Sequence, residues 1–209
     1  MQKLSIPYLK RLFDIIFSLL IIIITIPLFI IILLVIFIEH LLLGDILAPL
    51  FYTEKRISQG KPFNFKKFNI FKPRIIAKLK KQNIFIHTKN LEHSNGLTAV
   101  GFILKNIYLD ELPQLFNVLK GDISIVGPRP VNLEVYQKLL DKGVKTKSII
   151  KAGLTGNFQS LKGITQKTDI QLDQEYIDFC QNNSSWKIVW FDIKIILRTF
   201  IIVFKAEGI

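Results

Sequence analysis

Several features that define common sites are missing from this chain of 209 residues. It has a single cysteine, Cys180, and three histidines, His40, His87 and His93, that lie far apart in the sequence. One cysteine forms no intrachain disulfide and no cysteine metal cage, and the histidine spacing does not match a zinc site. Internal repeats and low-complexity linkers are also absent, and the length is that of one domain. These absences exclude a disulfide scaffold and a zinc domain, and they fit a reducing compartment.

Acidic residues are scarce. The chain has 16 Asp and Glu against 28 Lys and Arg, for a net charge of +12. Between Lys55 and Lys89 there are eleven basic residues and no acidic one. Half of the residues are apolar, and the mean hydropathy is +0.37. A chain that is both apolar and basic is expected to contact an anionic membrane surface, with nucleic acid as the alternative partner. We find no groove-reading motif, so we expect no nucleic-acid binding.

A long apolar run, Leu12 to Ile38, follows the basic pair Lys10 and Arg11. At 1.5 Å per residue a helix over this run would be about 40 Å long, more than the ~30 Å of a bilayer core. Length alone therefore predicts a spanning helix. Pro27, near its middle, would break the hydrogen-bond ladder and could turn the helix back to the face it entered. The basic flank favours a cytoplasmic N-terminus.

Two later segments have clear periodicity. Residues 50–53 and 62–65 favour strands and flank a turn at Ser58 to Gly60, which predicts a β-hairpin. The hairpin aromatics would belong to the core or contact the membrane, or they would form a stacking platform for bases (Phe63, Phe65 and Phe68). Residues 186–205 predict an amphipathic helix in the bilayer interface, with a buried core helix as the alternative. Its basic residues fall on one face (Lys187, Lys194, Arg198 and Lys205).

The stretch Tyr108 to Pro130, YLDELPQLFNVLKGDISIVGPRP, combines several functional signals. Apolar residues at helical spacing predict a helix from Glu111 to Lys120, with Asp110 near its N-cap and Gly121 near its C-cap. Capping alone would explain the two carboxylates. However, Pro128 and Pro130 also fix the backbone around Arg129, and a guanidinium held in this way suits bidentate phosphate recognition. Carboxylates and a phosphate-directed arginine together indicate phosphoryl chemistry with a metal.

The segments LDELPQLFNVLKGD and VGPRP resemble the signature of the bacterial sugar transferase family, the monotopic polyprenol-phosphate phosphoglycosyl transferases. The similarity runs from Lys10 to about Val203. It implies a mainly helical α+β fold with an N-terminal re-entrant membrane helix, a small β-hairpin and interfacial amphipathic helices around a compact catalytic core. Residues 1–40 would hold the basic end and the re-entrant or transmembrane helix. Residues 41–209 would form a cytosolic, membrane-associated transferase domain at a bacterial inner membrane.

The resemblance also implies a reaction. The enzyme would transfer a sugar phosphate from a UDP-sugar to polyprenyl (undecaprenyl) phosphate and release UMP, as the first membrane step of surface glycan or glycoprotein glycan assembly. The family's nucleophile matches Asp110, which would carry a covalent phosphosugar, and Glu111 would help to hold Mg²⁺. Self-association or contact with downstream glycosyltransferases is a further expectation.

Other matched positions complete the implied site. Phosphate-binding residues would be Lys67, Lys105, Pro128 and Arg129, and a nucleotide or sugar pocket would include Gln159, Asp173 and Tyr176. A helix-surface salt bridge or cap is an equal account of Asp173 and Tyr176. The chain departs from the family pattern at several positions, which leaves open a catalytically weakened homologue that acts as a membrane-bound scaffold (Ile26, Asn69, Lys105 and Ala152).

Overall fold

The computed structural model describes residues 3–76 and 96–204. These residues form two compact units. Among the described residues, unit 1 comprises 3–23, 54–65 and 114–204, and unit 2 comprises 24–53, 66–76 and 96–113. The first helix and the hairpin each contribute to both units, and each unit is described by itself below. The predicted division into residues 1–40 and 41–209 stays a prediction.

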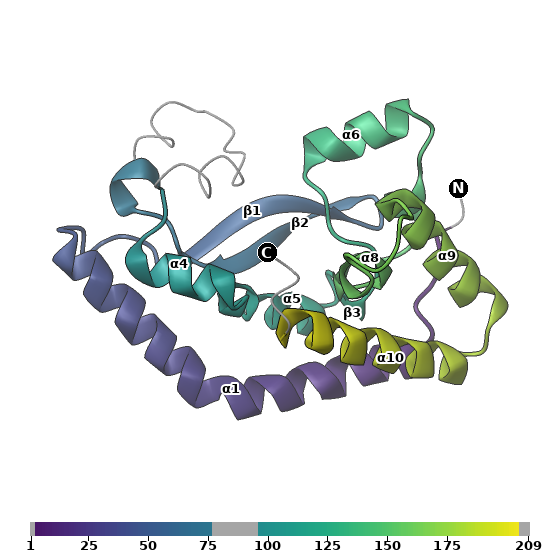
Figure 1. The fold of residues 1–209 in the computed structure, drawn as a ribbon, viewed down its shortest axis with the longest axis horizontal. Helices are drawn as coiled ribbons and strands as arrows, with labels where there is room; N and C mark the ends of the chain where they lie inside the picture. Colours follow the sequence, from purple (N-terminus) through teal and green to yellow (C-terminus); the bar gives the residue numbers. More distant parts are fainter. Residues whose placement is uncertain (1–2, 77–95, 205–209) are drawn as a thin grey trace. The chain divides into compact units, whose positions relative to one another are not determined.

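Most of the secondary structure is helical, as Figure 1 shows, so the predicted α+β, mainly helical class is confirmed. Two short strand pairs complete it, one of them the predicted hairpin. In chain order the elements are α1 (Tyr8–Leu42), β1 (Phe51–Ser58), β2 (Lys61–Phe68), α4 (Ala99–Asn106), the 3₁₀ helix η1 (Leu109–Glu111), α5 (Gln114–Lys120), β3 (Ser124–Val126), α6 (Leu133–Asp141), α7 (Thr146–Ile149), β4 (Gly153–Thr155), α8 (Asn157–Ser160), α9 (Asp169–Asn182) and α10 (Ser185–Phe204).

Helix α1 contains the whole predicted apolar run and is 35 residues long. By length and composition it is able to cross a membrane, and many of its large apolar side chains are exposed. Pro27 lies inside the helix. Membrane association therefore fits this helix, and its re-entrant course stays a prediction.

The hairpin between β1 and β2 has the predicted turn. Gln59 and Gly60 both have positive φ, 50° and 72°, as the two central residues of a type I′ turn require. The three hairpin phenylalanines are buried, with Phe68 fully covered (Phe63, Phe65 and Phe68). The core interpretation is confirmed, and a base-stacking platform is wrong, because buried rings offer no face for a base.

The core of unit 2 joins the second half of α1 to the hairpin and α4. Its buried side chains include Ile36, Phe68 and Leu104. Asn69 is also buried, and its amide donates to the Pro49 carbonyl at 2.8 Å while its side-chain oxygen accepts from the Phe71 amide at 3.2 Å. The side chain of Asn69, which departs from the family pattern, is therefore satisfied by local hydrogen bonds.

Unit 1 is held together by a buried polar network. The Lys10 ammonium pairs with Asp192 of α10 and donates to the Val126 carbonyl at the end of β3. Asp14 accepts from the Ser124 hydroxyl and the Ile125 amide, also in β3. The N-terminal part of α1 and helix α10 are thereby joined to one strand, and Figure 1 shows the two helices side by side.

Helix α10 has the buried face of the core-helix alternative, and its predicted place in the bilayer interface stays a prediction. Ile188, Asp192 and Ile195 are fully buried, while Trp186 and Trp190 are more than half exposed. The basic residues of its predicted stripe are exposed where the structure describes them (Lys187, Lys194 and Arg198), and Lys205 lies outside the described residues. One face thus belongs to the core, and the other carries the tryptophans and the positive charge.

Three glycines allow the short parallel pair β3–β4 to end in a very close contact. Ser124 pairs with Gly153 and Val126 with Thr155. A Cβ atom on Gly153 would lie 2.1 Å from the Gly127 nitrogen, and one on Gly156 would lie 2.2 Å from the Gly127 oxygen. Only glycine fits at these positions, so the loop that begins with Gly127 is packed directly on the β4 backbone.

We predict that Gly153→Ala destabilises the protein by about 2–3 kcal/mol, because the added methyl group meets backbone atoms that cannot move aside. The melting temperature of the detergent-solubilised chain, followed by circular dichroism, should fall by roughly 5–10 °C. Gly163→Ala is the matched control, because its Cβ would meet nothing within 4 Å and only its positive φ, 75°, is unfavourable. Equal losses in the two variants would contradict the close contact.

Candidate active site

The two adjacent carboxylates lie on η1, a single 3₁₀ turn. Tyr108 precedes it with a left-handed φ of 58°, and the Glu111 amide bonds back to the Tyr108 carbonyl. The predicted helix from Glu111 to Lys120 is therefore wrong in its first three residues, since α5 begins only at Gln114. Backbone hydrogen bonds from residue i to residue i−3 form the turn before Pro113. Pro113 has no N–H and cannot continue this pattern. Asp110 is inside the turn rather than at the N-cap of a helix.

The other end of this prediction is confirmed. Gly121 has φ 85° directly after α5, and its amide bonds to the Val118 carbonyl. The Asp122 amide bonds to the Asn117 carbonyl, which is the hydrogen bond of a glycine C-cap.

Lys67 of β2 contacts both carboxylates. Its ammonium is 2.7 Å from Glu111 Oε1 and 3.3 Å from Asp110 Oδ2. Burial alone would lower the pKa of Lys67, but Glu111 and Asp110 outweigh it and raise the pKa above its usual value. Asp110 is 3% exposed, whereas Glu111 is partly open to solvent. A covered carboxylate thus lies beside an accessible one, and the Lys67 ammonium contacts both.

This donor set suits Mg²⁺ better than zinc. Among the described residues no group of three or more His, Cys, Asp or Glu side chains gathers to hold a metal. Magnesium binds through one or two carboxylates and takes its other ligands from water and substrate phosphates. Two carboxylates that already converge on a cationic ammonium fit that pattern, so the predicted magnesium ligand Glu111 is chemically suitable.

Lys105, predicted to bind phosphate, lies in the last turn of α4. Its carbonyl accepts from the Tyr108 amide at 3.1 Å, so its backbone helps to fix the turn that carries the carboxylates. Lys67, Lys105, Asp110 and Glu111 are all in unit 2.

The predicted phosphate loop lies in unit 1. Pro128 accepts a hydrogen bond from the Gly153 amide at 2.9 Å, and Arg129 accepts one through its carbonyl from Lys147 at 3.0 Å. Pro128 and Pro130 are buried, whereas Arg129 is exposed. The backbone on both sides of Arg129 is therefore held while its side chain faces outward, as phosphate recognition would require.

Asp173 and Tyr176 are buried on α9. The Asp173 carboxylate is 2.6 Å from Lys147, and the Tyr176 hydroxyl donates to Asp192 at 2.7 Å. Burial and the Asp192 carboxylate raise the pKa of Tyr176, which keeps its phenol protonated as a donor. A helix-surface salt bridge is the wrong account, since both residues are covered, and their part in a sugar pocket stays a prediction.

Gln159, on α8, is partly exposed, but its side-chain carbonyl oxygen is buried and has no hydrogen-bond partner among the described residues. An unpaired acceptor of this kind is costly unless a ligand or water satisfies it. The structure thus leaves the Gln159 side-chain oxygen without a protein donor, and its pocket role stays a prediction.

Sequence reasoning missed Lys147 and Asp192, which position the loop and the helices. Both are charged and at least 95% buried, and each pairs with a residue far away in the chain. The only local signal is an acid within an apolar helix at Asp192. No local signal distinguishes Lys147 from the exposed lysines around it.

We predict that Lys67→Met lowers thermal stability, because it removes the cation that both carboxylates contact and leaves two adjacent negative charges. The double variant Lys67→Met/Glu111→Gln should recover part of the loss, since one of those charges is gone. Melting temperatures by scanning fluorimetry test this. Lys138→Met is the control, because it breaks an exposed pair with Glu134 that contributes only ~0.5 kcal/mol. A double variant no more stable than the single one would refute the coupling.

Comparison with known proteins shows the family to which this chain belongs. The Bacterial sugar transferase family model matches residues 6–206. The chain is 32% identical to the undecaprenyl-phosphate galactose phosphotransferase of Salmonella typhimurium over 100% of its own length and 43% of that protein. It is 34% identical to the UDP-glucose:undecaprenyl-phosphate glucose-1-phosphate transferase of Escherichia coli over 76% of its length and 33% of that protein.

A third relative is similar in size. The uncharacterized sugar transferase EpsL of Bacillus subtilis is 32% identical over 96% of this chain and 90% of its own length. By contrast, the chain spans less than half of the Salmonella and Escherichia proteins. The match that covers nearly every described residue, including the carboxylate turn and the proline-flanked arginine, shows that this chain belongs to the bacterial sugar transferase family.

Proposed function

We propose that this chain transfers a sugar phosphate from a UDP-sugar to polyprenyl phosphate, releases UMP and forms a polyprenyl diphosphate sugar. The observation that carries the proposal is the buried Asp110 carboxylate beside Glu111, with the Lys67 ammonium facing both. The names of the Salmonella and Escherichia relatives support it, since both contain undecaprenyl phosphate and a hexose.

In the first step, an Asp110 oxygen attacks the phosphorus that bears the sugar. The bond from that phosphorus to the bridging oxygen breaks, and UMP leaves with the electron pair. In the second step, an oxygen of polyprenyl phosphate attacks the same phosphorus and displaces the Asp110 carboxylate. A carboxylate nucleophile thus divides one difficult displacement into two easier ones. It also lets a water-soluble donor and a lipid acceptor use the same site in turn.

Glu111 would help to hold Mg²⁺, which would neutralise negative charge on the substrate phosphates when bound. The cationic side chains of this chain would also neutralise negative charge on the substrate phosphates. Lys67 lies at the carboxylates, Lys105 on the adjoining helix, and the outward-facing Arg129 would make a bidentate contact to phosphate. Gln159 would accept from a donor group on the nucleotide or sugar.

The reaction would take place at the cytosolic face of a bacterial inner membrane, where α1 and the exposed face of α10 meet the lipid. The alternative of a weakened scaffold receives little support from the departures in sequence. Asn69 is satisfied by local bonds, and the Ala152 amide donates to Ser58 Oγ at 3.0 Å, a bond that proline does not make. These departures have structural explanations that do not require lost activity.

We predict that Asp110→Asn abolishes UMP release while the melting temperature stays close to that of the wild type. Detergent-solubilised protein would be incubated with UDP-galactose, UDP-glucose and UDP-N-acetylglucosamine in turn, with polyprenyl phosphate and Mg²⁺. Asp141→Asn, on the exposed helix α6, is the matched control. Trapping with radiolabelled donor and no lipid should label the peptide that contains Asp110. Turnover above a few per cent in the variant would rule out the covalent route.

A second prediction concerns Arg129. Arg129→Lys should lower kcat/KM about tenfold or more, because a bidentate fork is exchanged for a point charge. The backbone bonds of the loop remain, so the melting temperature should not change. Steady-state UMP release at varied donor concentration measures the effect, with Lys145→Arg, also exposed, as the control. Wild-type kinetics in Arg129→Lys would remove this residue from the phosphate site.

A further inference from the structure

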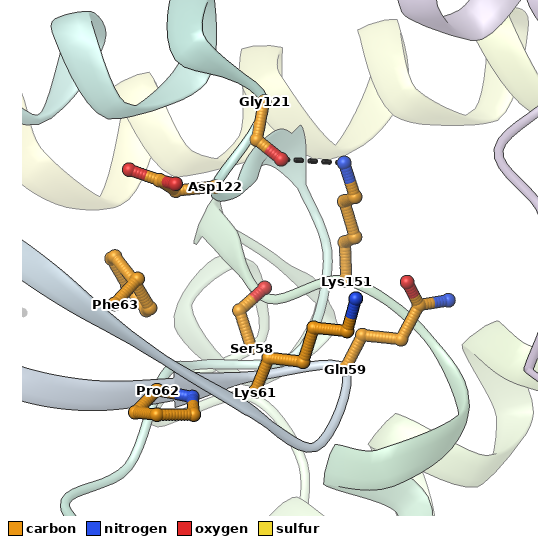
Figure 2. A pocket seen from close by; sticks show the side chains of 8 residues that line it. All are labelled: Ser58, Gln59, Lys61, Pro62, Phe63, Gly121, Asp122 and Lys151. Carbon is orange, nitrogen blue, oxygen red and sulfur yellow. Dashed lines mark hydrogen bonds between the residues drawn. The ribbon is translucent and has the colours of Figure 1, made fainter.

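Unit 1 contains a basic pocket at the tip of the hairpin, and neither Asp110 nor Glu111 lines it. Its volume is about 240 Å³, well above the ~10–15 Å³ that one water molecule needs. The hairpin turn supplies Ser58, Gln59 and Lys61, and Gly121, Asp122 and Lys151 line the other side. Figure 2 shows the Lys61 side chain extending from the turn and the Lys151 ammonium directed at the Gly121 carbonyl.

Positive charge is concentrated here. A Cβ atom placed on Gly121 would lie 3.4 Å from Arg11 Nη2 and 3.6 Å from Lys151 Nζ, so both cations converge on one point. Burial and the Arg11 guanidinium lower the pKa of Lys151, with Lys61 acting in the same direction, and the acids Asp14 and Asp122 do not offset this. An anion in the pocket would reduce the repulsion between Lys151 and the neighbouring cations Arg11 and Lys61.

Some of these groups are fixed by the fold. Arg11 donates to the Val118 and Leu119 carbonyls at 2.7 Å, so it caps the C-terminal end of α5. The Asp122 carboxylate accepts from the Asn117 amide at 2.9 Å. Gln59 donates to the Leu4 and Ile149 carbonyls. These hydrogen-bond acceptors near the pocket therefore already accept from donors of the protein.

The donors are in excess. Lys61 is exposed and has no hydrogen-bond or ion-pair partner among the described residues. Lys151 has one recorded bond, to Gly121, out of three N–H donors, and Ser58 Oγ accepts from Ala152 while its own hydroxyl proton remains available. A pocket with two ammonium groups and spare donors matches a ligand that is anionic and has several acceptor oxygens, which is the chemistry of phosphate.

We propose that this pocket binds a phosphate group, held by Lys61 and Lys151 with the Ser58 hydroxyl. Two sources share this chemistry, a soluble phosphate and the headgroup of an anionic phospholipid. The second is geometrically reasonable, because Arg11 belongs to α1, whose exposed residues at the same end include Tyr8 and Leu9. The proposal does not depend on the reaction proposed above.

The experiment uses the full chain without sugar donor or polyprenyl phosphate, so it reads binding and not turnover. One arm titrates inorganic pyrophosphate into detergent-solubilised protein by calorimetry. The other measures flotation with phosphatidylcholine vesicles, with and without phosphatidylglycerol. Lys61→Gln should weaken binding about five- to tenfold in the arm that represents the true source. Lys61→Arg should retain binding, and Lys142→Gln, at another exposed lysine, is the matched control.

Lysine acetylation footprinting provides a measurement on the unmutated protein. The ligand should protect Lys61 and Lys151 and leave Lys142 unprotected. If Lys61→Gln weakens only the binding of pyrophosphate, the source is a soluble phosphate. If it weakens only the binding to phosphatidylglycerol vesicles, the source is a lipid headgroup. If Lys61→Gln behaves like Lys142→Gln in both arms and neither pocket lysine is protected, the pocket does not bind phosphate.

Discussion

The buried ion pair between Lys10 and Asp192 is the constraint on which the architecture of unit 1 depends. It joins the first helix to the last across 182 positions of sequence, with the Tyr176 hydroxyl and the Val126 carbonyl as further partners. Breaking one side of such a pair typically costs 3–5 kcal/mol, because the remaining charge is left in a dry interior. The long apolar helix α1 is thereby tied to the strand that leads into the arginine loop.

That strand transmits the constraint to the loop. Asp14 accepts from both Ser124 and Ile125, and the glycines at the ends of β3 and β4 let the two backbones touch. Lys147 then bonds to the Arg129 carbonyl and pairs with Asp173. These connections from α1 to the loop are buried charges with partners and backbone contacts that exclude a side chain. Neither type tolerates small displacements.

Local features of the sequence predicted much of this. The long apolar helix, the hairpin turn at Gln59 and Gly60, and the helix from Ser185 follow from hydropathy and turn chemistry, which act over a few residues. The tight turn at Asp110 could not be predicted in this way, because apolar spacing continues through it and suggests one helix. The partners of Lys10 and Lys147 were also beyond prediction, since only the tertiary fold brings Asp192 and Asp173 to them.

The left-handed backbone of Tyr108 has a consequence for the carboxylates that follow it. A non-glycine residue in this region is strained, and here hydrogen bonds on both sides, to Lys105 and from Glu111, hold it in place. The backbone positions of Asp110 and Glu111 are therefore fixed by main-chain hydrogen bonds, which do not involve the ammonium of Lys67. If an incoming anion drew the Lys67 ammonium away, these main-chain bonds would remain, so the same rigid turn would serve successive ligands.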